Sequence, residues 1–502
     1  MITRLQIDGF KNLVGVDLHF GPFTCIAGPN GAGKSNLFDA IRFLGALASR
    51  QSLMQAAATV RDNRRAADMR SIFHRVGDRC ADRMTFGVEM IVPETATDEL
   101  GQPANASLTF LRYELELGLR QDSDSGGSTL EIRREALLPI TQGEAAKLLP
   151  FPHKASPWRK SVVRGARRGG PFVSTTQKEG KIVIQRHQDS GSRTSQNNQD
   201  GGSRGRPIPA PAQSLKRTIV SAATAEAPTL LCAQREMESW LQLQLEPTAL
   251  RQSSELNSTP HLKPNGEGLP ATLYRIARTS NSPEAVYARV ANRLAELVKD
   301  VREINVERDD KLELLTLTLT DREGTRHPAR SLSDGTLRFL ALSVLEMDTE
   351  ANGVLCLEEP ENGIHPDRIT AMLRLLQDIS MDVDLAVGPE NPLRQILVNT
   401  HSPLVVGECP DDALVLARGV ETVAEGHTFN KVSFQGLAQT WRDKSDTYAV
   451  SRGQLLTYLN PLCLQPPSSA DSPSSQHRPS RRVRDRIDLM QGDFFRQMVA
   501  EK

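Results

Sequence analysis

The chain has 502 residues, with 61 Lys and Arg against 61 Asp and Glu, so its bulk charge gives no indication of a nucleic acid or membrane partner. Six scattered cysteines without a Cys-x-x-Cys pair indicate a reduced protein with neither a disulfide framework nor a zinc site. The N-terminus MITRLQIDGF lacks the apolar core of a secretory signal, and no apolar stretch approaches the ~18 residues that span a bilayer. We therefore expect a cytoplasmic protein with no membrane partner.

The first fifty residues alternate between strand-like and helical patterns. Ile2 to Ile7, Val14 to Phe20 and Phe23 to Ala27 predict three strands. GPNGAGKS at 28–35 comes next, and apolar residues at helical spacing follow from Leu37 to Leu44. This order of strand, loop and helix is the context that a G-x-x-x-x-G-K-[ST] phosphate-binding loop requires.

Such a P-loop has a defined chemistry. Its glycines let backbone N–H groups wrap around a phosphate, and the N-terminus of the next helix adds a favourable dipole. We expect Lys34 to reach the β- and γ-phosphates and Ser35 to ligate Mg²⁺. The sequence thus predicts a nucleotide site, and the other residues expected to bind the nucleotide there are Asn30, Gly31, Ala32, Gly33 and Asn36.

The composition changes after residue 150. Residues 151–217 contain 14 Lys and Arg against 3 Asp and Glu, and they are rich in Gly, Ser, Pro and Gln. Such a segment buries too little apolar surface to offset its chain entropy. We therefore expect a basic, largely disordered insertion over 151–224, in which KIVIQRH forms one short strand.

Regular patterns return after residue 225. SPEAVYARVANRLAELVKDV predicts a helix with Ser282 as its N-cap and Pro283 as its first residue, and KLELLTLTLT predicts a strand. Near the C-terminus, LQPPSSADSPSSQHRPS predicts a linker and RRVRDRIDLMQGDFFRQMVAE a basic helix.

Three later motifs carry further chemistry. In RSLSDGTLRFLALSVLEM, Ser333 and Gly335 open a helix whose N-terminus can bind an anion. VLCLEEPE predicts a buried strand that ends in two carboxylates. One of them can hold Mg²⁺ through water, and the other can orient or deprotonate an attacking water. Strand alternation points Glu358 and Glu359 to opposite faces unless the chain turns at once. QILVNTHSPLVV places His401 after another strand, where its imidazole can hydrogen-bond a γ-phosphate.

The order of these four motifs resembles that of ABC-type ATPases, specifically the RecF/SMC/OLD-like branch. IDGFKNL, GKSN, LSDGTLRFLAL and EEPENGIHP carry the resemblance. REALL, WLQLQLEPTALR and NGEGLPATLYRI are similar to segments of "AAA-like" bacterial ATPases found in antiphage systems. The resemblance covers about 1–150 and 225–455.

The resemblance implies an α/β P-loop NTPase with an ABC-type head, made of mixed β-sheets and a helical subdomain, that dimerises around two ATP molecules. Each ATP would lie between the P-loop of one subunit and the signature of the other, with Mg²⁺ as the second cofactor. Lys11 would contact the nucleotide, and Glu358 would help hold Mg²⁺. The catalytic residues would be Glu359, Lys34 and, as the switch histidine, His401. The signature residues that act in trans would be Ser333, Asp334, Gly335 and Thr336. The D-loop residues would be Asn362, Gly363 and His365.

The chain also departs from its relatives. No sustained heptads indicate a coiled-coil arm. No DxD cluster follows His401, so we expect no TOPRIM nuclease domain, and no Q-loop glutamine can be assigned. We expect an N-terminal half of the head at 1–150, the insertion at 151–224, a helical subdomain at 225–300, a C-terminal half at 301–460, and a linker with a basic helix at 461–502.

Two functions remain open. In the first, ATP-driven dimerisation of the head controls the engagement of DNA, with a nuclease supplied in trans, in antiphage defence or DNA repair. The basic insertion and Arg478, Arg481, Arg482, Arg484 and Arg486 would then contact phosphates. In the second, the chain is a slow-hydrolysing, nucleotide-gated scaffold that sequesters and releases a toxin or nuclease. The terminal helix, with Phe494, Phe495 and Met498, would then dock the partner.

Overall fold

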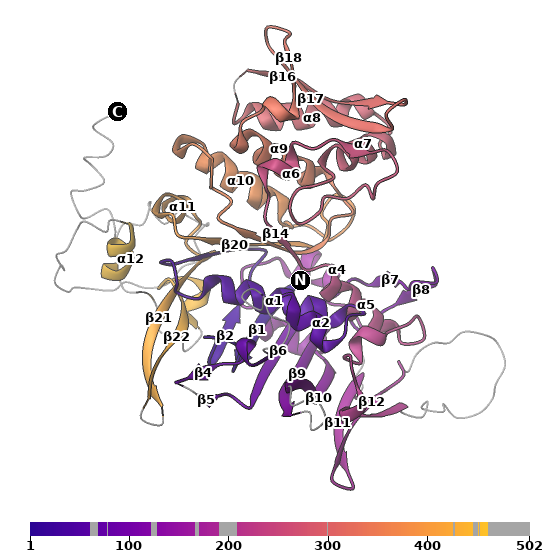
Figure 1. The fold of residues 1–502 in the computed structure, drawn as a ribbon, viewed down its shortest axis with the longest axis vertical. Coiled ribbons are helices and arrows are strands. Elements are labelled where there is room, and N and C mark those ends of the chain that lie inside the picture. The colour runs from indigo at the N-terminus through magenta and orange to yellow at the C-terminus, as the bar shows by residue number, and fades with distance from the viewer. Residues whose placement is uncertain are drawn as a thin grey trace.

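The computed structural model describes residues 1–60, 69–77, 79–121, 128–165, 170–189, 208–298, 300–424, 427–444, 450 and 452–459. Two lobes meet at a central parallel sheet, as Figure 1 shows: antiparallel strands fill the lower lobe, and helices under a small sheet fill the upper lobe. None of the described helices combines the length and the apolar character needed to cross a membrane.

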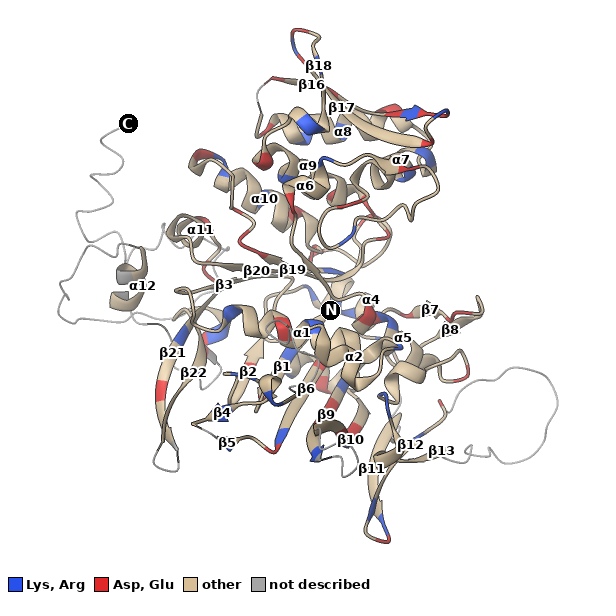
Figure 2. Cartoon of the chain, viewed as in Figure 1, with Lys and Arg blue, Asp and Glu red and all other residues tan. Residues whose placement is uncertain are grey.

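The lower lobe is built on an eight-stranded antiparallel sheet in the order β13-β12-β11-β10-β9-β6-β1-β2. One face packs its apolar residues against helix α1 (Lys34–Ala48). The other face carries ion pairs such as Arg4–Asp17 and Arg112–Glu89, so that blue and red residues interleave along these strands in Figure 2. The strands are β1 (Ile2–Asp8), β2 (Val16–His19), β6 (Arg83–Ile91), β9 (Phe110–Gln121), β10 (Ser128–Pro139), β11 (Val173–Lys178), β12 (Lys181–Arg186) and β13 (Ile208–Pro211).

The expectation of a largely disordered insertion over 151–224 is wrong for its described parts, 151–165, 170–189 and 208–224. Strands β11, β12 and β13 extend the sheet of the lower lobe, and the expected strand in KIVIQRH is β12. Phe151 and Trp158 are buried in a small core, and Ile184 is buried in the main one. A few large side chains thus anchor a segment whose average composition is polar, and the average hides them.

A six-stranded sheet in the order β14-β19-β20-β3-β21-β22 runs through the middle of the molecule. Strands β14 to β21 in this order are parallel, and β22 is antiparallel to β21. Covered faces explain why the central strands are continuous apolar runs rather than alternating ones. The strands are β14 (Leu241–Leu243), β19 (Gly353–Glu358), β20 (Arg394–Thr400), β3 (Phe23–Ala27), β21 (Leu414–Ala424) and β22 (His427–Gly436).

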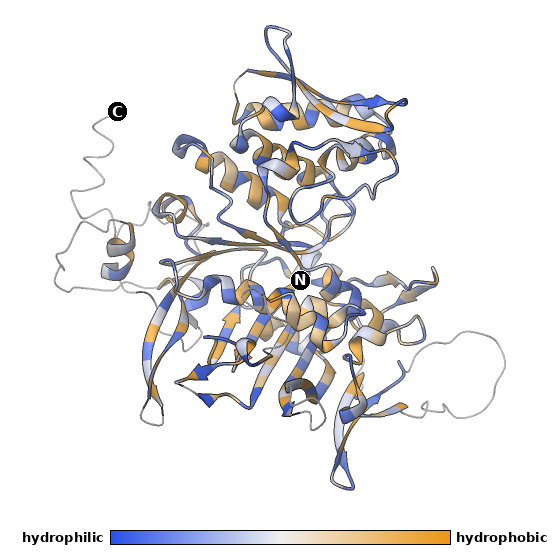
Figure 3. Ribbon diagram, in the orientation of Figure 1, coloured by the Kyte–Doolittle hydropathy of each residue, from blue (hydrophilic) through white to orange (hydrophobic). Residues whose placement is uncertain are grey.

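The upper lobe packs helices beneath a four-stranded sheet, and Figure 3 shows apolar positions, in orange, along these helices and strands. Their apolar residues form a buried core. This lobe extends beyond the helical subdomain expected at 225–300, because the segments after residue 300 share its hydrophobic core. Ser282 stands at the N-cap of α8, but its side chain caps no backbone N–H. The elements are α6 (Pro247–Leu250), α7 (Leu269–Thr279), α8 (Pro283–Ala295), α9 (Asp334–Met347), α10 (Ile369–Ile379), β15 (Ser254–Glu255), β16 (Val301–Asp309), β17 (Leu314–Asp321) and β18 (Arg326–Pro328).

Smaller elements complete the α/β fold. Helix α5 packs against α1 and belongs to the core of the lower lobe rather than to the upper one. The expected linker and basic helix at 461–502 lie outside the described residues. The remaining elements are α2 (Leu53–Ala58), α3 (Gln142–Leu148), α4 (Lys160–Val162), α5 (Pro228–Glu238), α11 (Pro403–Glu408), α12 (Arg452–Leu459), β4 (Arg75–Val76), β5 (Arg79–Cys80), β7 (Thr95–Thr97) and β8 (Pro103–Asn105).

Candidate functional site

The predicted P-loop joins β3 to α1. Gly31 and Gly33 adopt φ angles of 79° and 101°, which favour glycine. A Cβ on Gly33 would lie 2.4 Å from Asn12 Nδ2, and one on Gly28 would lie 2.4 Å from the carbonyl oxygen of Ala417. Backbone conformation therefore requires glycine at positions 31 and 33, and close packing requires it at positions 28 and 33. These requirements fix the curvature of the loop.

Lys34 lies beneath this loop with only 6% of its surface exposed. Its Nζ donates hydrogen bonds to the carbonyl oxygens of Gly28 and Pro29 at 2.7 and 3.0 Å. Burial lowers the pKa of Lys34, and the nearby carboxylates of Glu359 and Glu358 partly oppose that shift. The loop thus holds a buried ammonium group that interacts electrostatically with the carboxylates of Glu359 and Glu358.

The IDGFKNL segment contacts the P-loop through Asn12, which the sequence analysis missed. Asn36 Nδ2 donates to Asn12 Oδ1 at 2.8 Å, so these two side chains hold each other at the start of α1. Lys11 has a φ of 48°, and its Nζ lies 2.9 Å from the buried carboxylate of Asp39. In this structure Lys11 therefore forms an ion pair with Asp39, a residue of α1 in the same chain.

Sheet order brings the remaining motifs to the P-loop. Strands β19, β20 and β3 are parallel neighbours, with Glu358 opposite Asn399 and Thr400 opposite Ala27. The carboxyl ends of parallel strands meet at one edge, where α/β proteins bind ligands. The P-loop, His401 and the Glu358–Glu359 pair therefore lie side by side at that edge.

The chain turns at Glu359 itself, which has a φ of 45°. Its backbone N–H donates to the carbonyl oxygen of Asn399 at 2.9 Å and anchors the turn to β20. A left-handed non-glycine residue costs about 1 kcal/mol or more, and such strain concentrates at functional sites. The turn answers the question raised by strand alternation, because the chain leaves the strand direction at Glu359 and both carboxylates act electrostatically on Lys34.

Both carboxylate oxygens of Glu359 are engaged. His401 Nδ1 lies 2.6 Å from Oε1, and Asn362 Nδ2 donates to Oε2 at 2.8 Å. Burial alone would raise the pKa of Glu359, but the hydrogen bonds from Asn362 and His401 outweigh it, so the pKa lies below its usual value. Glu359 is thus an ionised carboxylate held between the D-loop and the histidine.

The residues around Glu358 fit a Mg²⁺ site. Gln242 on β14, which the sequence analysis also missed, donates from Nε2 to Glu358 Oε1 at 2.9 Å. Its own Oε1 is buried and has no hydrogen-bond partner among the described residues. The Glu358 carboxylate and the Gln242 amide oxygen are oxygen ligands of the kind that Mg²⁺ prefers. Only the pairing of β14 with β19 reveals Gln242.

A third carboxylate lies behind this pair. Glu361 is 8% exposed and accepts a hydrogen bond from the Thr400 hydroxyl, while its Oε2 has no partner among the described residues. Burial raises the pKa of Glu361, and the negative charge of Glu359 adds to the effect. Glu361 and Thr400 thus tie the acidic loop to the histidine strand, and the EEPE segment is the signal that could have indicated this.

The signature segment lies on the upper lobe. Ser333 caps α9 by accepting from the Thr336 N–H at 3.3 Å. A Cβ on Gly335 would lie 2.4 Å from the carbonyl oxygen of Gly363, so this glycine lets the D-loop pack directly on the signature helix. Arg338 on the same helix donates to the carbonyl oxygen of Asn362. Signature and D-loop therefore form one contiguous surface that ends at Glu359.

Two further residues of these motifs are placed at the periphery. Asp334 accepts from Arg251 at 2.6 Å, which binds the start of α9 to α6. His365 is 66% exposed and caps the short turn that follows the D-loop. Asp334 and His365 belong to the same surface as Gly335. Neither is among the residues that meet near Lys34 at the carboxyl ends of β3, β20 and β19.

Two protein families match this chain. Residues 1–76, which include the P-loop, match the family described as "RecF/RecN/SMC N terminal domain". Residues 258–407, which include the signature, the two glutamates and His401, match the family described as "AAA domain, putative AbiEii toxin, Type IV TA system". The two matches thus contain most of the residues that the structure brings together.

Individual relatives match over short stretches. An OLD nuclease of Thermus scotoductus is 51% identical over 41 residues, which is 8% of each chain. The DNA replication and repair protein RecF of Haemophilus influenzae is 49% identical over 45 residues, or 9% of this chain and 12% of RecF. The chain therefore matches only a small part of the length of these relatives.

Solved structures give remote likenesses. An SMC head bound to the C-winged helix domain of ScpA is 13% identical with a TM-score of 0.41, and it covers 87% of this chain and 98% of that one. The SMC head domain of Thermotoga maritima is 11% identical with a TM-score of 0.34, with the same coverage. In its family matches and its four ordered motifs, the chain is similar to the RecF/SMC/OLD-like branch of the ABC-type ATPases.

Proposed function

We propose that this protein binds and hydrolyses ATP with Mg²⁺ at the sheet edge formed by β3, β20 and β19. The observation that carries the proposal is the convergence of Lys34, Glu359 and His401 at the ends of three adjacent parallel strands. A fortuitous glycine-rich turn would not be expected to have a buried lysine that faces two carboxylates.

Each residue of the site has a distinct task. Lys34 and the backbone N–H groups of the P-loop would bind phosphate oxygens, and Ser35, Glu358 and Gln242 would hold the metal ion. Mg²⁺, when bound, neutralises charge that develops on the phosphates. Glu359 orients the attacking water and accepts its proton, and His401 positions Glu359 and offers an N–H to the γ-phosphate.

We further propose that the site is completed by a second copy of the chain. Ser333, Asp334, Gly335 and Thr336 open α9 on the upper lobe, whereas the P-loop and α1 belong to the lower lobe in Figure 1. The packing of Gly335 on Gly363 makes signature and D-loop a single surface that can contact the nucleotide of a partner copy. Dimerisation would then act on Glu359 through Asn362.

The engaged state of Glu359 favours slow turnover of the single chain, because both carboxylate oxygens are occupied and the pKa is lowered. Slow turnover suits either a head whose dimerisation controls DNA engagement or a scaffold that holds and releases a toxin or nuclease. Lys178 and Lys181 at the turn between β11 and β12 are exposed and available to phosphates, which supports the first function.

Three proteins test the proposal: the unaltered chain, Lys34→Ala and Glu359→Gln. Lys34→Ala should lose ATP binding, and retained affinity would exclude the P-loop assignment. Glu359→Gln should bind ATP, lose at least ~100-fold in turnover and accumulate as a dimer in size-exclusion chromatography with ATP. Unchanged turnover would show that another group is the base. Stimulation of ATP turnover by DNA would favour the first function. A complex of Glu359→Gln with a partner protein that forms equally well with and without DNA would favour the second function.

A further inference from the structure

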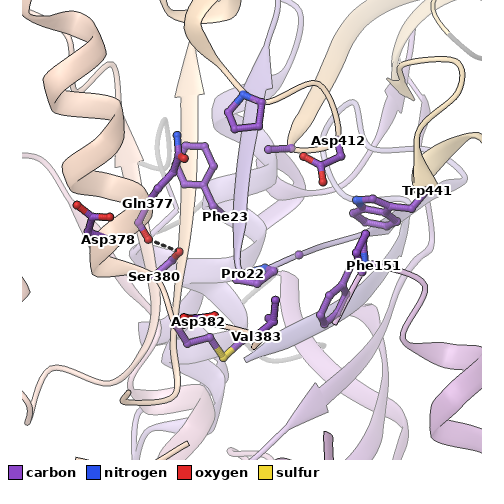
Figure 4. Close-up of a pocket in the computed structure, with 15 residues that line it drawn as sticks. Pro22, Phe23, Phe151, Gln377, Asp378, Ser380, Asp382, Val383, Asp412 and Trp441 are labelled. Carbon is purple, nitrogen blue, oxygen red and sulfur yellow. Dashed lines mark hydrogen bonds between the residues drawn. The ribbon is translucent and has the colours of Figure 1, made fainter. Parts of the chain in front are cut away.

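A pocket of about 480 Å³ lies at the other end of the central sheet. Four segments form it: the start of β3, the chain after α3, the C-terminal end of α10, and the loops on either side of the β21–β22 hairpin. In Figure 4, Phe151 and Trp441 stand on one side and Gln377 and Asp378 on the other, with Asp412 above and Asp382 below. Its volume falls in the range of ligand-binding clefts.

This pocket is separate from the nucleotide site. Phe23, which lines it, begins β3, whereas the P-loop follows Ala27 at the end of the same strand. Five residues of extended chain span roughly 16 Å. None of the residues placed in the nucleotide site above lines the pocket.

The lining combines aromatic rings with carboxylates. Phe23, Phe151 and Trp441 supply the rings, and the Arg442 guanidinium, 4.1 Å from the centre of the Trp441 ring, fixes that ring in place. Three aspartates, Asp378, Asp382 and Asp412, supply the charge, and among the described residues that line the pocket none is Lys, Arg or His.

Existing cations counter two of these three charges. Asp378 pairs with Arg293 on the upper lobe, and Asp412 interacts electrostatically with the buried Arg442 guanidinium. Lys154 pairs with Asp384 rather than with a lining residue. Asp382 is exposed, and among the described residues its carboxylate accepts a hydrogen bond from the backbone N–H of Asp384. Aromatic rings beside carboxylates select cations, above all guanidinium groups, which stack on rings while they pair with carboxylates.

We propose that this pocket binds the arginine-rich segment RPSRRVRDR, residues 478–486, of the same chain. The segment carries five arginines and one aspartate, and so complements the acidic lining. The described chain ends at Leu459 in α12, and α12 packs on α11, which leads into the lining residues Pro410 and Asp412. The 18 residues between 460 and 477 can span up to about 60 Å, so the segment can reach the pocket without strain.

Tryptophan quenching in the full-length protein tests this docking. The chain has three tryptophans, and Trp158 and Trp240 are 0% and 6% exposed, so acrylamide reports mainly on Trp441. The variants are Arg481, Arg482, Arg484 and Arg486 all changed to Glu, the pocket change Asp382→Lys, and their combination. Asp310→Lys reverses an equally accessible charge on the upper lobe, 73% exposed, and serves as the control.

If the segment covers the pocket, the quenching constant of Trp441 should rise about threefold in the arginine variant and in Asp382→Lys. In the combined variant, where both charges are reversed, the quenching constant should return at least halfway to the value of the unaltered chain. In Asp310→Lys it should equal the value of the unaltered chain. Equal quenching of the unaltered chain and the arginine variant would overturn the proposal. Protection of Trp441 that disappears on tenfold dilution would overturn the same-chain assignment, because a second copy would then supply the segment.

Discussion

The hydrogen bond between Asn362 and Glu359 allows a sharp test of how the proposed catalytic carboxylate is controlled. Asn362→Ala removes the Nδ2 donor that lies 2.8 Å from Glu359 Oε2, while His401 still contacts Oε1. A hydrogen bond to a charged group contributes about 1.5–3 kcal/mol when buried. Since the Glu359 side chain is 31% exposed, solvent screening reduces this to about 0.5–1 kcal/mol.

That free energy has two kinetic consequences. The pKa of Glu359 should rise, because the ionised form loses a donor. The freed oxygen becomes available to water, so basal ATP turnover of the isolated chain should increase about 2- to 5-fold at pH 8. Initial rates between pH 5 and 9 measure both quantities. Asn352→Ala, which alters an exposed asparagine before β19, is the matched control.

A fall in turnover of tenfold or more for Asn362→Ala would refute this reasoning. Asn362 would then position Glu359 for catalysis rather than restrain it. An acidic limb of the pH–rate profile that moved to lower pH would also contradict it, because loss of a donor to a carboxylate cannot favour the ionised form.

Two other predictions concern the metal site and the core. Gln242→Leu removes both the donor to Glu358 and the unpartnered amide oxygen. The Mg²⁺ concentration for half-maximal turnover should therefore rise about fivefold, while the affinity for ATP in the absence of metal stays unchanged. An unaltered Mg²⁺ requirement would exclude Gln242 from the metal site. Burial raises the pKa of Glu135 from 4.5 to about 7, although the Ile219 and Val220 N–H groups donate to it. Because the folded chain binds this proton more tightly than the unfolded chain, the contribution to stability is complete below pH 4.5 and is lost as the pH rises through 7. The total loss is about 3 kcal/mol. Glu135→Gln should therefore match the unaltered chain in urea unfolding at pH 5 and exceed it in stability at pH 8, whereas parallel pH profiles would show that Glu135 is ionised throughout.

Local patterns in the sequence predicted the elements that carry the chemistry. The strands β1, β2 and β3, the P-loop and the following helix are specified by short-range periodicity and by glycine spacing, which depend little on the rest of the chain. The same holds for the acidic strand β19 and the histidine strand β20, because covered parallel strands read as continuous apolar runs.

The insertion shows why composition failed where periodicity succeeded. Disorder was expected over 151–224 because average polarity was high. In the described parts, pairing of β11 with β10 gives the segment a sheet to extend, and Trp158 and Phe151 fill a core that other segments supply. A segment that adds to an existing core needs fewer apolar residues than one that must form its own.

The sequence by itself determined which residues could bind phosphate, hold a metal or act as a base. Only the tertiary structure decided which of them act together, since strand order is set by long-range pairing that no local pattern records. The order β14-β19-β20-β3 brings Gln242 to Glu358 and His401 to Glu359, and a left-handed turn at Glu359 ends the acidic strand. The acidic pocket at the opposite end of β3 likewise exists only because four distant segments converge there.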